Sequence, residues 1–467
     1  MRTKYLQRNI LAEDFGDIRL NRRFDMICEE FSSNLSATIP QVAKTKRDAK
    51  AMYRFFDNKQ VTPVKQLYAH RPQLNKKVSA LELKRFLQLD DSTEADMTGK
   101  KGAKALGPLN YIHRRGLWLH NSLITDHNGA PLGLLHQSYI IRNDEDFGKA
   151  AERKKLPFED KESYRWKEHF LKGQALCEEH EDLEGVYVAD READIMELYQ
   201  ARSCERMHFV QRSKHNRKLA DKSDNLYPYL SKQKRVGTYE LSLIHPHTKK
   251  KRIATIEVRF TKVDLKLHKA LPTKRHLPAV TFYAVEAKEI NPPEDIDEPV
   301  HWVLLTTLPV ESFEDAMEII RIYTLRWIIE RYHYILKSGG AHIEDLQLET
   351  PHRLKNAMTA YSIAALNAFT IRYYAEKTPQ VDIYQIGITE TEYKVLYTYA
   401  QYDMKLNVQF DTDNIPTIRE FCIVLGQIGG FIPSKRQPLP GLKILSRAIQ
   451  KLNNMVDIYL IFCQRIE

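Results

Sequence analysis

The sequence predicts an α/β core flanked by helical segments, and three observations support this prediction. Short apolar runs at 86–89 and 185–189 each lead into aspartate and indicate buried strands. Two further apolar runs flank Asn128-Gly129, a dipeptide that favours a β-hairpin turn. Stretches with helical spacing follow the hairpin and the second strand. The order strand, hairpin, helix, strand, helix is typical of an α/β fold.

The first 75 residues are expected to be helical. Apolar residues from Leu11 to Phe31 recur at roughly helical spacing, with arginines between them. A second helical stretch contains Tyr53, among lysines and arginines at 44–54. Both a small DNA-binding module and a plain helical bundle with a basic face fit this pattern.

The core elements follow from about residue 80. We expect a strand at 86–89, a hairpin at 117–125 and 131–141, a helix at 160–180, a strand at 185–189 and a helix at 191–199.

Basic residues concentrate in the next segment. Residues 201–280 hold 20 Lys or Arg and 6 Asp or Glu, a net of +14, whereas the whole chain of 467 residues carries +10. Positive charge concentrated in one segment favours a polyanionic partner. A basic surface that only keeps the protein soluble would have the same net charge. The β-like runs in and just after this segment are Met207–Arg212, Thr238–His245, Ile253–Phe260 and Ala279–Val285.

The C-terminal part resumes the α/β pattern and then becomes helical. We expect a strand at Trp302–Thr306 and then a long helix that starts with a capping box of Ser312 and Asp315. Residues 342–376 are expected to be helical, 377–440 mixed, and 441–463 an amphipathic helix. That last helix either packs on its own domain or mediates self-association.

The composition argues against several classes of protein. With 43% hydrophobic residues the chain can bury a core. No apolar run reaches the roughly 18–20 residues of a membrane span, and the N-terminus lacks the apolar stretch of a secretory signal. The five cysteines form no CxxC pair, which fits a reducing cytosol. No GxxxxGK[ST], GxSxG or HExxH motif occurs, and His136, His333 and His342 fit polar or core positions better than metal ligation.

Three carboxylates are candidates for a divalent-metal site. Asp91 and Asp190 sit where apolar strand runs end, and strand ends in an α/β sheet hold side chains rigidly and near one another. The long helix supplies Glu330 as the third ligand. Carboxylate oxygens are the ligands that Mg²⁺ prefers, and two such ions catalyse in-line displacement at phosphorus.

Glu330 shares a helix face with Tyr323, Arg326 and Lys337. At about 100° per residue these four side chains fall within an arc roughly 60° wide, apart from the apolar face. Such a stripe can place one carboxylate on a metal and two cations on phosphate. Alternatively, Arg326 and Glu330 form an ordinary i,i+4 ion pair on a solvated face.

The spacing Tyr323-x2-Arg326-x3-Glu330-x6-Lys337 resembles the Y-R-E-K signature of the insertion-sequence-four family of bacterial DDE transposases, which includes the Tn-five transposase. The segments Asp90–Thr93 and Asp190–Asp194 resemble those around the first and second catalytic aspartates of that family. Further local matches, which extend the resemblance over nearly the whole chain, are Ala51–Phe55, Gly133–Gln137, Arg212–His215 and Glu289–Pro293.

The resemblance implies an RNase H-like (retroviral integrase-like) catalytic core at 76–375, interrupted by a β-rich basic insertion at about 205–298. It implies a helical DNA-binding domain at 1–75 and a mainly helical dimerisation domain at 376–467. The long stretch between Asp190 and Glu330 leaves room for such an insertion.

The resemblance also implies the chemistry of cut-and-paste transposition. Asp91, Asp190 and Glu330 would be catalytic and would bind two Mg²⁺ ions, for which Mn²⁺ would substitute. One strand at the transposon end is nicked, its 3′-hydroxyl forms a hairpin with the other strand, the hairpin is opened, and the 3′-hydroxyl joins target DNA.

The implied DNA contacts divide into two groups. Tyr323, Arg326 and Lys337 would bind phosphates near the cut, and Trp302 would stack on a flipped base, unless it is only a core residue of its strand. The residues that would contact the DNA end from the insertion are Arg212, Lys214 and His215.

The implied partners are double-stranded DNA, as transposon-end inverted repeats and as target, and a second copy of the chain in the synaptic complex. We expect no membrane association and a cytoplasmic, nucleoid-associated bacterial protein. Two alternatives share the core: a metal-dependent endonuclease without strand transfer, and a catalytically inactive DNA-binding inhibitor of transposition.

Overall fold

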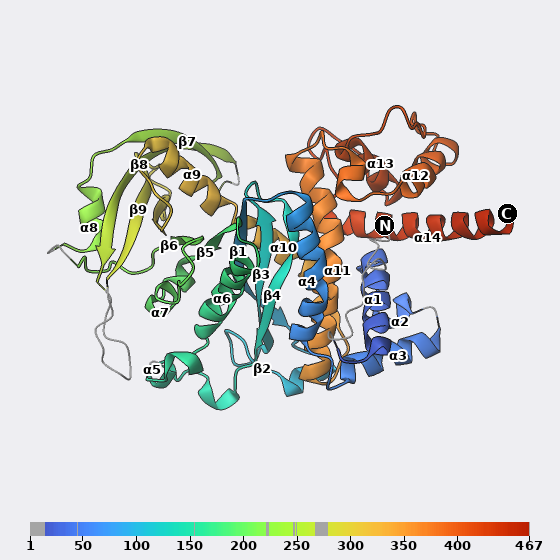
Figure 1. Ribbon diagram of the computed structural model, residues 1–467, viewed down its shortest axis with the longest axis horizontal. Coiled ribbons are helices and arrows are strands. Elements are labelled where there is room, and N and C mark those ends of the chain that lie inside the picture. The colour runs from blue at the N-terminus through green and yellow to red at the C-terminus, as the bar shows by residue number, and fades with distance from the viewer. Residues whose placement is uncertain are drawn as a thin grey trace.

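A computed structural model describes residues 15–466 apart from 44, 154, 221–223, 246–247, 249 and 267–278. The expected helical position Leu11 lies outside this part. Figure 1 shows one sheet crossing the molecule, with the strands of the insertion at its left end and the N-terminal and C-terminal helices at its right.

Within the described residues the strands form a single sheet with the order β2-β3-β1-β5-β6-β10-β9-β8-β7, and β4 pairs with β3. The strands are β1 (Arg85–Asp96), β2 (Gly107–Pro108), β3 (Arg115–Asp126), β4 (Pro131–Ile140), β5 (Glu184–Ala189), β6 (Met207–Arg212), β7 (Gly237–Ile244), β8 (Lys251–Leu265), β9 (Val280–Glu289) and β10 (His301–Thr306). The α-helices are α1 (Ile18–Ser33), α2 (Ile39–Val42), α3 (Lys46–Asp57), α4 (Pro63–Ala80), α5 (Ala150–Arg153), α6 (Tyr164–Glu179), α7 (Met196–Tyr199), α8 (Leu226–Ser231), α9 (Phe313–Thr324), α10 (Trp327–Lys337), α11 (Pro351–Lys377), α12 (Glu390–Tyr402), α13 (Ile418–Ile428) and α14 (Leu442–Ile466).

The core strands have the RNase H-like arrangement. β1, β3 and β4 form an antiparallel meander, β5 runs parallel to β1, and β6 runs parallel to β5. The spatial order β4-β3-β1-β5-β6 therefore confirms the expected α/β core. The predicted hairpin is also present: β3 and β4 flank the Asn-Gly turn, where Gly129 has φ +95°, a conformation that favours glycine.

The insertion continues the core sheet. β10 pairs antiparallel with β6 on one side and with β9 on the other. β8 and β7 extend the sheet further. The edge of β6 is covered in this way, and its backbone donors and acceptors are paired with those of β10.

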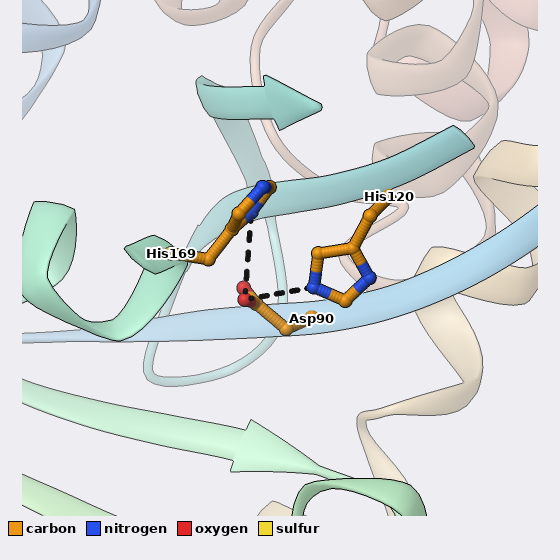
Figure 2. A group of neighbouring side chains, drawn as sticks. All are labelled: Asp90, His120 and His169. Carbon is orange, nitrogen blue, oxygen red and sulfur yellow. Dashed lines mark ion pairs between the residues drawn. The ribbon is translucent and has the colours of Figure 1, made fainter. Parts of the chain in front are cut away.

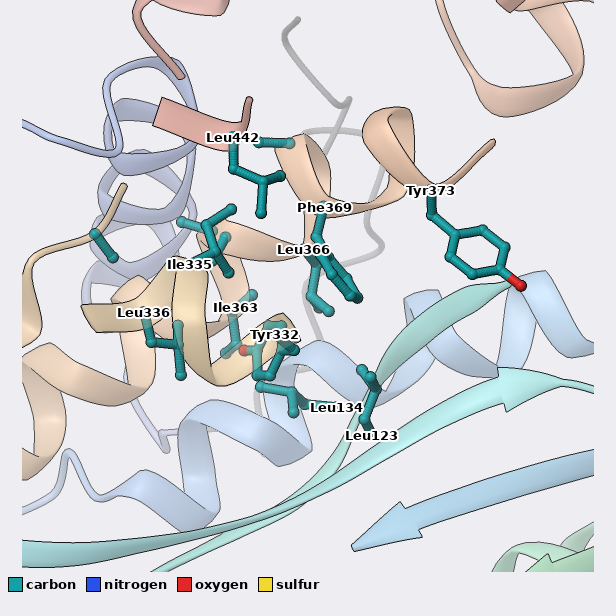
Figure 3. Packing of buried hydrophobic residues seen from close by; sticks show 14 of the residues in the cluster. Leu123, Leu134, Tyr332, Ile335, Leu336, Ile363, Leu366, Phe369, Tyr373 and Leu442 are labelled. Atoms are coloured by element: carbon teal, nitrogen blue, oxygen red, sulfur yellow. The ribbon is translucent and has the colours of Figure 1, made fainter. Parts of the chain in front are cut away.

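The long helix α11 joins the two helical ends of the chain to the core. The Phe31 ring of α1 stacks on the Tyr361 ring of α11, with centroids 3.9 Å apart, and the Tyr361 hydroxyl donates a hydrogen bond to the Ala37 carbonyl. In Figure 3, Leu442 of α14 lies near Phe369 of α11 in the same buried cluster. No helix in the described ranges is both long and apolar enough to span a membrane.

Two expectations about local structure were wrong. The strand expected at 86–89 does not end before the aspartates, because every residue from Phe86 to Asp96 pairs with β3. The single long helix is two helices, α9 and α10. At the break the Thr324 hydroxyl donates to the Arg321 carbonyl (2.7 Å), and the backbone bonds tighten to three-residue steps, such as Arg326 N to Tyr323 O (3.1 Å).

Two helical ranges also begin or divide differently from the prediction. Residues 191–193 form a 3₁₀ turn before the short α7. α11 starts at Pro351 rather than near 342, since Thr350 caps it and proline fits the first helical turn. By contrast, the capping box of Ser312 and Asp315 at the start of α9 is present as expected.

Candidate active site

Three carboxylates from three elements gather at one edge of the core. Asp91 lies on β1, Asp190 directly follows β5, and Glu330 lies in the first turn of α10. The parallel register pairs Leu89 with Val188, so Asp91 and Asp190 occupy matching positions two residues further along. The Asp190 carboxylate accepts a hydrogen bond from the Glu192 amide (2.8 Å), which fixes the turn after β5.

The guanidinium of Arg326 lies between two of these carboxylates. Its Nη1 is 3.3 Å from Asp91 Oδ2, and its Nη2 is 2.7 Å from Glu330 Oε1. The Arg326 side chain is only 10% exposed, so this contact is not an ion pair on a solvated face. The arginine instead bridges β1 and α10 at the centre of the site.

Burial and neighbouring negative charge make Asp91 hard to ionise. The pKa of Asp91 is raised to about 7, mainly by burial; Arg326 and the Ser92 amide oppose the shift, and the charges of Asp190 and Glu330 add to it. A cation placed among these carboxylates would favour the ionised form. The oxygen donors fit a hard divalent ion such as Mg²⁺, and Asp91, Asp190 and Glu330 are the residues that would hold it.

Tyr323 and Trp302 lie beside the carboxylates as an aromatic pair. Their ring centroids are 5.5 Å apart in an edge-to-face arrangement. Tyr323 is 5% exposed, and burial raises the pKa of its hydroxyl, which interacts with Arg326 and lies within the field of Asp190. Trp302 is partly buried, so it packs on the core and still keeps an exposed part.

Lys337 lies at the other end of α10, about 10 Å along the helix axis from Glu330. Its ammonium is 3.3 Å from the Glu344 carboxylate, which also accepts a hydrogen bond from the Asp96 amide at the end of β1 (2.9 Å). α10 therefore runs along β1, and the break between α9 and α10 does not separate Arg326, Glu330 and Lys337.

The predicted contacts of the insertion line a polar pocket next to the site. Arg212 and Lys214 belong to its wall, and Arg212 donates a hydrogen bond to the His301 carbonyl (3.1 Å). His215 is exposed on the same loop. The pocket has a volume of about 480 Å³ and is lined by Arg191, Glu192, Arg212, Ser213, Lys214, Tyr227, His301 and Val303. The register pairs Arg212 with Leu304, so Arg212 starts on the same face of the sheet as Trp302, whereas His301 and Val303 lie on the other face.

One buried carboxylate that the sequence reasoning missed organises that loop. Asp194 Oδ2 accepts hydrogen bonds from the amides of Lys214 (2.7 Å) and His215 (2.9 Å). Its Oδ1 accepts from the Tyr199 hydroxyl (2.7 Å) and from Arg217 Nε (3.1 Å) and Nη2. Burial would raise the pKa of Asp194, but Arg217 and these hydrogen bonds hold it below its usual range.

A second missed group lies on the face of β1 opposite to Asp91. The Asp90 carboxyl faces the imidazoles of His120 on β3 and His169 on α6 (Figure 2). Burial raises the pKa of Asp90 well above its usual range and lowers the pKa of both histidines well below theirs. The sequence does contain a signal for this group. Gln88, Asp90 and Ser92 are polar residues at every second position of an apolar strand, which places them on one face of the sheet.

The histidines singled out from the sequence lie outside the carboxylate site. His333 is buried on α10 with its Nε2 3.0 Å from Asn121 Nδ2, and burial, followed by the charges of Lys337 and Arg326, lowers its pKa to about 3. His136 is buried beside the His169 ring. His342 is partly exposed in a left-handed turn with φ +48°.

Two family models match the chain. The model described as transposase DNA-binding matches residues 2–61, and the model described as transposase DDE domain matches residues 172–367, which include Asp190 and Glu330 but not Asp91. Among solved structures, the chain is similar to a piggyBac transposase in a synaptic complex with hairpin DNA. The identity is 8% and the TM-score 0.35, and the alignment covers 79% of this chain and 66%, just under two thirds, of that chain.

Proposed function

We propose that this chain, a DDE transposase by its two matched domains, moves DNA by a cut-and-paste reaction of the insertion-sequence-four type. The observation that supports this most directly is the position of Asp91 and Glu330 on either side of Arg326, with Asp190 close enough for its charge to act on Asp91, at the edge of an RNase H-like sheet. The spacing of Tyr323, Arg326, Glu330 and Lys337 supports the finer family assignment.

Asp91, Asp190 and Glu330 would hold two Mg²⁺ ions, with Mn²⁺ as a substitute. When bound, such ions activate a water or a 3′-hydroxyl and stabilise the leaving oxygen of an in-line displacement at phosphorus. Asp91 must lose its proton before it can act as a ligand. Because its pKa is about 7 without metal and a bound cation favours the ionised form, the metal concentration needed for cleavage should rise as the pH falls below neutrality.

The remaining side chains of the site would position the DNA. Arg326 at the start of α10 and Lys337 at its end would bind separate phosphates near the cut, about 16 Å apart along the helix axis, with the Tyr323 hydroxyl beside Arg326. Trp302, partly buried against Tyr323, would stack on an unpaired base while the 3′-hydroxyl attacks the opposite strand and forms the hairpin. Arg212, Lys214 and His215 would hold the DNA end from the insertion.

The helical ends of the chain would select and pair the DNA ends. We propose that residues 1–75 contribute to recognition of the inverted repeat, that 76–375 form the catalytic domain, and that 376–467 mediate dimerisation. The exposed apolar residues Ile458, Ile461 and Phe462 recur at helical spacing on one face of α14, which supports self-association through that helix.

Incubation with Mg²⁺ and supercoiled DNA that carries candidate inverted repeats tests this proposal. Wild type should release hairpin-ended DNA and join it to target, whereas Asp91→Asn should lower the rate at least about a thousandfold. Asp182→Asn is the matched control, because that carboxylate is 88% exposed in the loop before β5. Cleavage without hairpins or joining would favour the endonuclease, and DNA binding without cleavage would favour the inactive inhibitor.

A further inference from the structure

A compact set of metal-ligating atoms lies behind the catalytic strand. Asp90 Oδ2 is 3.5 Å from His120 Nε2 and 3.7 Å from His169 Nδ1, and all three atoms lie within 4.8 Å of one another. Figure 2 shows both imidazoles directed at the Asp90 carboxyl from β3 and α6. None of the three side chains is more than 1% exposed.

In each imidazole, the nitrogen that faces away from Asp90 is hydrogen-bonded to a serine hydroxyl. His120 Nδ1 is 2.7 Å from Ser92 Oγ, and His169 Nε2 is 2.8 Å from Ser138 Oγ. When these nitrogens carry the ring protons and donate to the hydroxyls, lone pairs remain on His120 Nε2 and His169 Nδ1. Metal-bound histidines are oriented by such a bond from the other ring nitrogen.

Two of the three atoms that face one another also lack hydrogen bonds. Within the described ranges neither Asp90 Oδ2 nor His120 Nε2 has a hydrogen-bond partner, although both are buried. The other oxygen, Asp90 Oδ1, accepts a bond from Gln88 Nε2 (3.1 Å). When Asp90 is ionised these two atoms are buried acceptors directed at each other, and a cation between them would satisfy both.

We propose that Asp90, His120 and His169 bind one transition-metal ion, for which Zn²⁺ has the best-fitting chemistry, at a structural site separate from the catalytic carboxylates. Two imidazoles and one carboxylate form a common zinc donor set, whereas imidazole disfavours Mg²⁺. With metal–ligand distances of about 2.0–2.1 Å, tetrahedral ligands lie roughly 3.3 Å apart, so the separations of 3.5 and 3.7 Å from Asp90 to the two histidines need only a small contraction.

Ser122 completes the site. Its Oγ is 2.7 Å from His169 Nδ1 and also approaches the Asp90 carboxyl. Without metal the hydroxyl donates a hydrogen bond to His169, and with metal it becomes the fourth ligand. The ion would tie β1 to β3 and α6 next to Asp91, and because the site is closed to solvent it would enter during folding.

Metal analysis of the full-length chain, purified without a histidine tag, tests this site. We expect about one zinc per chain that survives dialysis against millimolar Mg²⁺. After denaturation in chelator, refolding with Co²⁺ alone should give the visible absorption of a tetrahedral site. His120→Ala and His169→Ala should each weaken metal retention at least about 100-fold.

Two control proteins separate this site from the others. The double variant Asp91→Asn, Glu330→Gln lacks catalytic carboxylates and should still bind zinc. His208→Ala removes a partly buried histidine of β6 that lies outside the cluster, and it should also bind zinc. Loss of zinc from either control would overturn the assignment.

The wild-type protein decides the question if the histidine variants fail to fold. Less than about 0.1 zinc per chain, both from zinc-supplemented cells and after refolding with zinc, would overturn the proposal. Asp90, His120 and His169 would then form a metal-free hydrogen-bonded cluster in which Asp90 keeps its proton. Octahedral cobalt absorption would overturn it equally, because the proposed four ligands cannot produce that spectrum.

Discussion

Replacing Asp194 by asparagine should release the loop that carries Lys214 and His215 while leaving the catalytic carboxylates in place. The asparagine side chain has the same shape but only one acceptor oxygen. Its NH₂ group, a donor, would therefore face other donors, either the backbone N–H groups of Lys214 and His215 or the side chains of Arg217 and Tyr199. Arg217 would also remain buried without its charge partner, because its side chain is only 6% exposed.

The size of this effect follows from the burial of the pair. Removing one partner of a buried ion pair costs about 3–5 kcal/mol. If this free-energy cost destabilises only the closed state of the loop, the equilibrium constant for loop opening rises roughly 100-fold or more. Hydrogen exchange of the Lys214 and His215 amides should accelerate by that factor, while exchange in β5 and β1 stays unchanged.

DNA binding gives a second measurement of the same change. Asp194→Asn should weaken binding to the transposon end and lower the slope of log affinity against log salt by about 1 to 2, since phosphate contacts of Lys214 and its neighbours are lost. Glu197→Gln on α7, a partly exposed carboxylate of the same segment, is the matched control. Two results would refute the reasoning. One is exchange of the Lys214 and His215 amides at the wild-type rate in Asp194→Asn, and the other is weaker DNA binding with an unchanged dependence of affinity on salt.

The stabilisation by Asp194 should depend on pH in one direction. Its pKa in the folded protein is below the usual value, so the contribution is present above about pH 4 and is lost as the pH falls through the folded pKa. The difference in exchange between wild type and Asp194→Asn should therefore be constant from pH 5 to 8 and shrink in acid. A difference that grew in acid would show that another group is responsible.

Three further predictions concern the catalytic face and α14. Arg326→Gln should bind Mn²⁺ more tightly than wild type at pH 8.5, because the guanidinium no longer competes for Asp91 and Glu330, while the cleavage rate falls. Calorimetry measures the Mn²⁺ affinity, and weaker binding would contradict this. Trp302→Ala should reduce hairpin formation roughly 5- to 150-fold while nicking is retained, as gel analysis of end products would show; equal hairpin yields would make the residue purely structural. Phe462→Glu should convert a DNA-bound dimer to a monomer in light scattering, and a persistent dimer would exclude that face.

Features encoded by a few neighbouring residues were predictable from the sequence. The Asn128-Gly129 turn and the capping box of Ser312 and Asp315 depend on local backbone geometry, and both are present. The three carboxylates could be proposed because each has a local mark, the end of an apolar run or a place in a helical stripe. The bridging of Asp91 and Glu330 by Arg326 could not be derived, because it depends on how α10 lies along β1.

Features that depend on pairing between distant strands were not predictable. β1 continues past Asp91 because β3 supplies partners up to Asp96, and nothing near Asp91 signals that. His120 meets Asp90 only through the register of β1 and β3, and His169 arrives from α6. The role of Asp194 likewise depends on a loop some twenty residues further along the chain, which no local pattern links to it.

The continuity of the sheet makes the protein a molecular ruler. The proposed DNA contacts begin at Arg212, the last residue of β6, and β6 is one strand position from β5, about 5 Å at the usual strand spacing. In B-form DNA that spacing corresponds to about one to two base pairs. If these residues hold the DNA end as proposed, hydrogen-bonded strands rather than a flexible hinge set the distance from that contact to Asp190. A change in the pairing of β5 with β6, more than a change of any single side chain, would then move the cut to a different base pair.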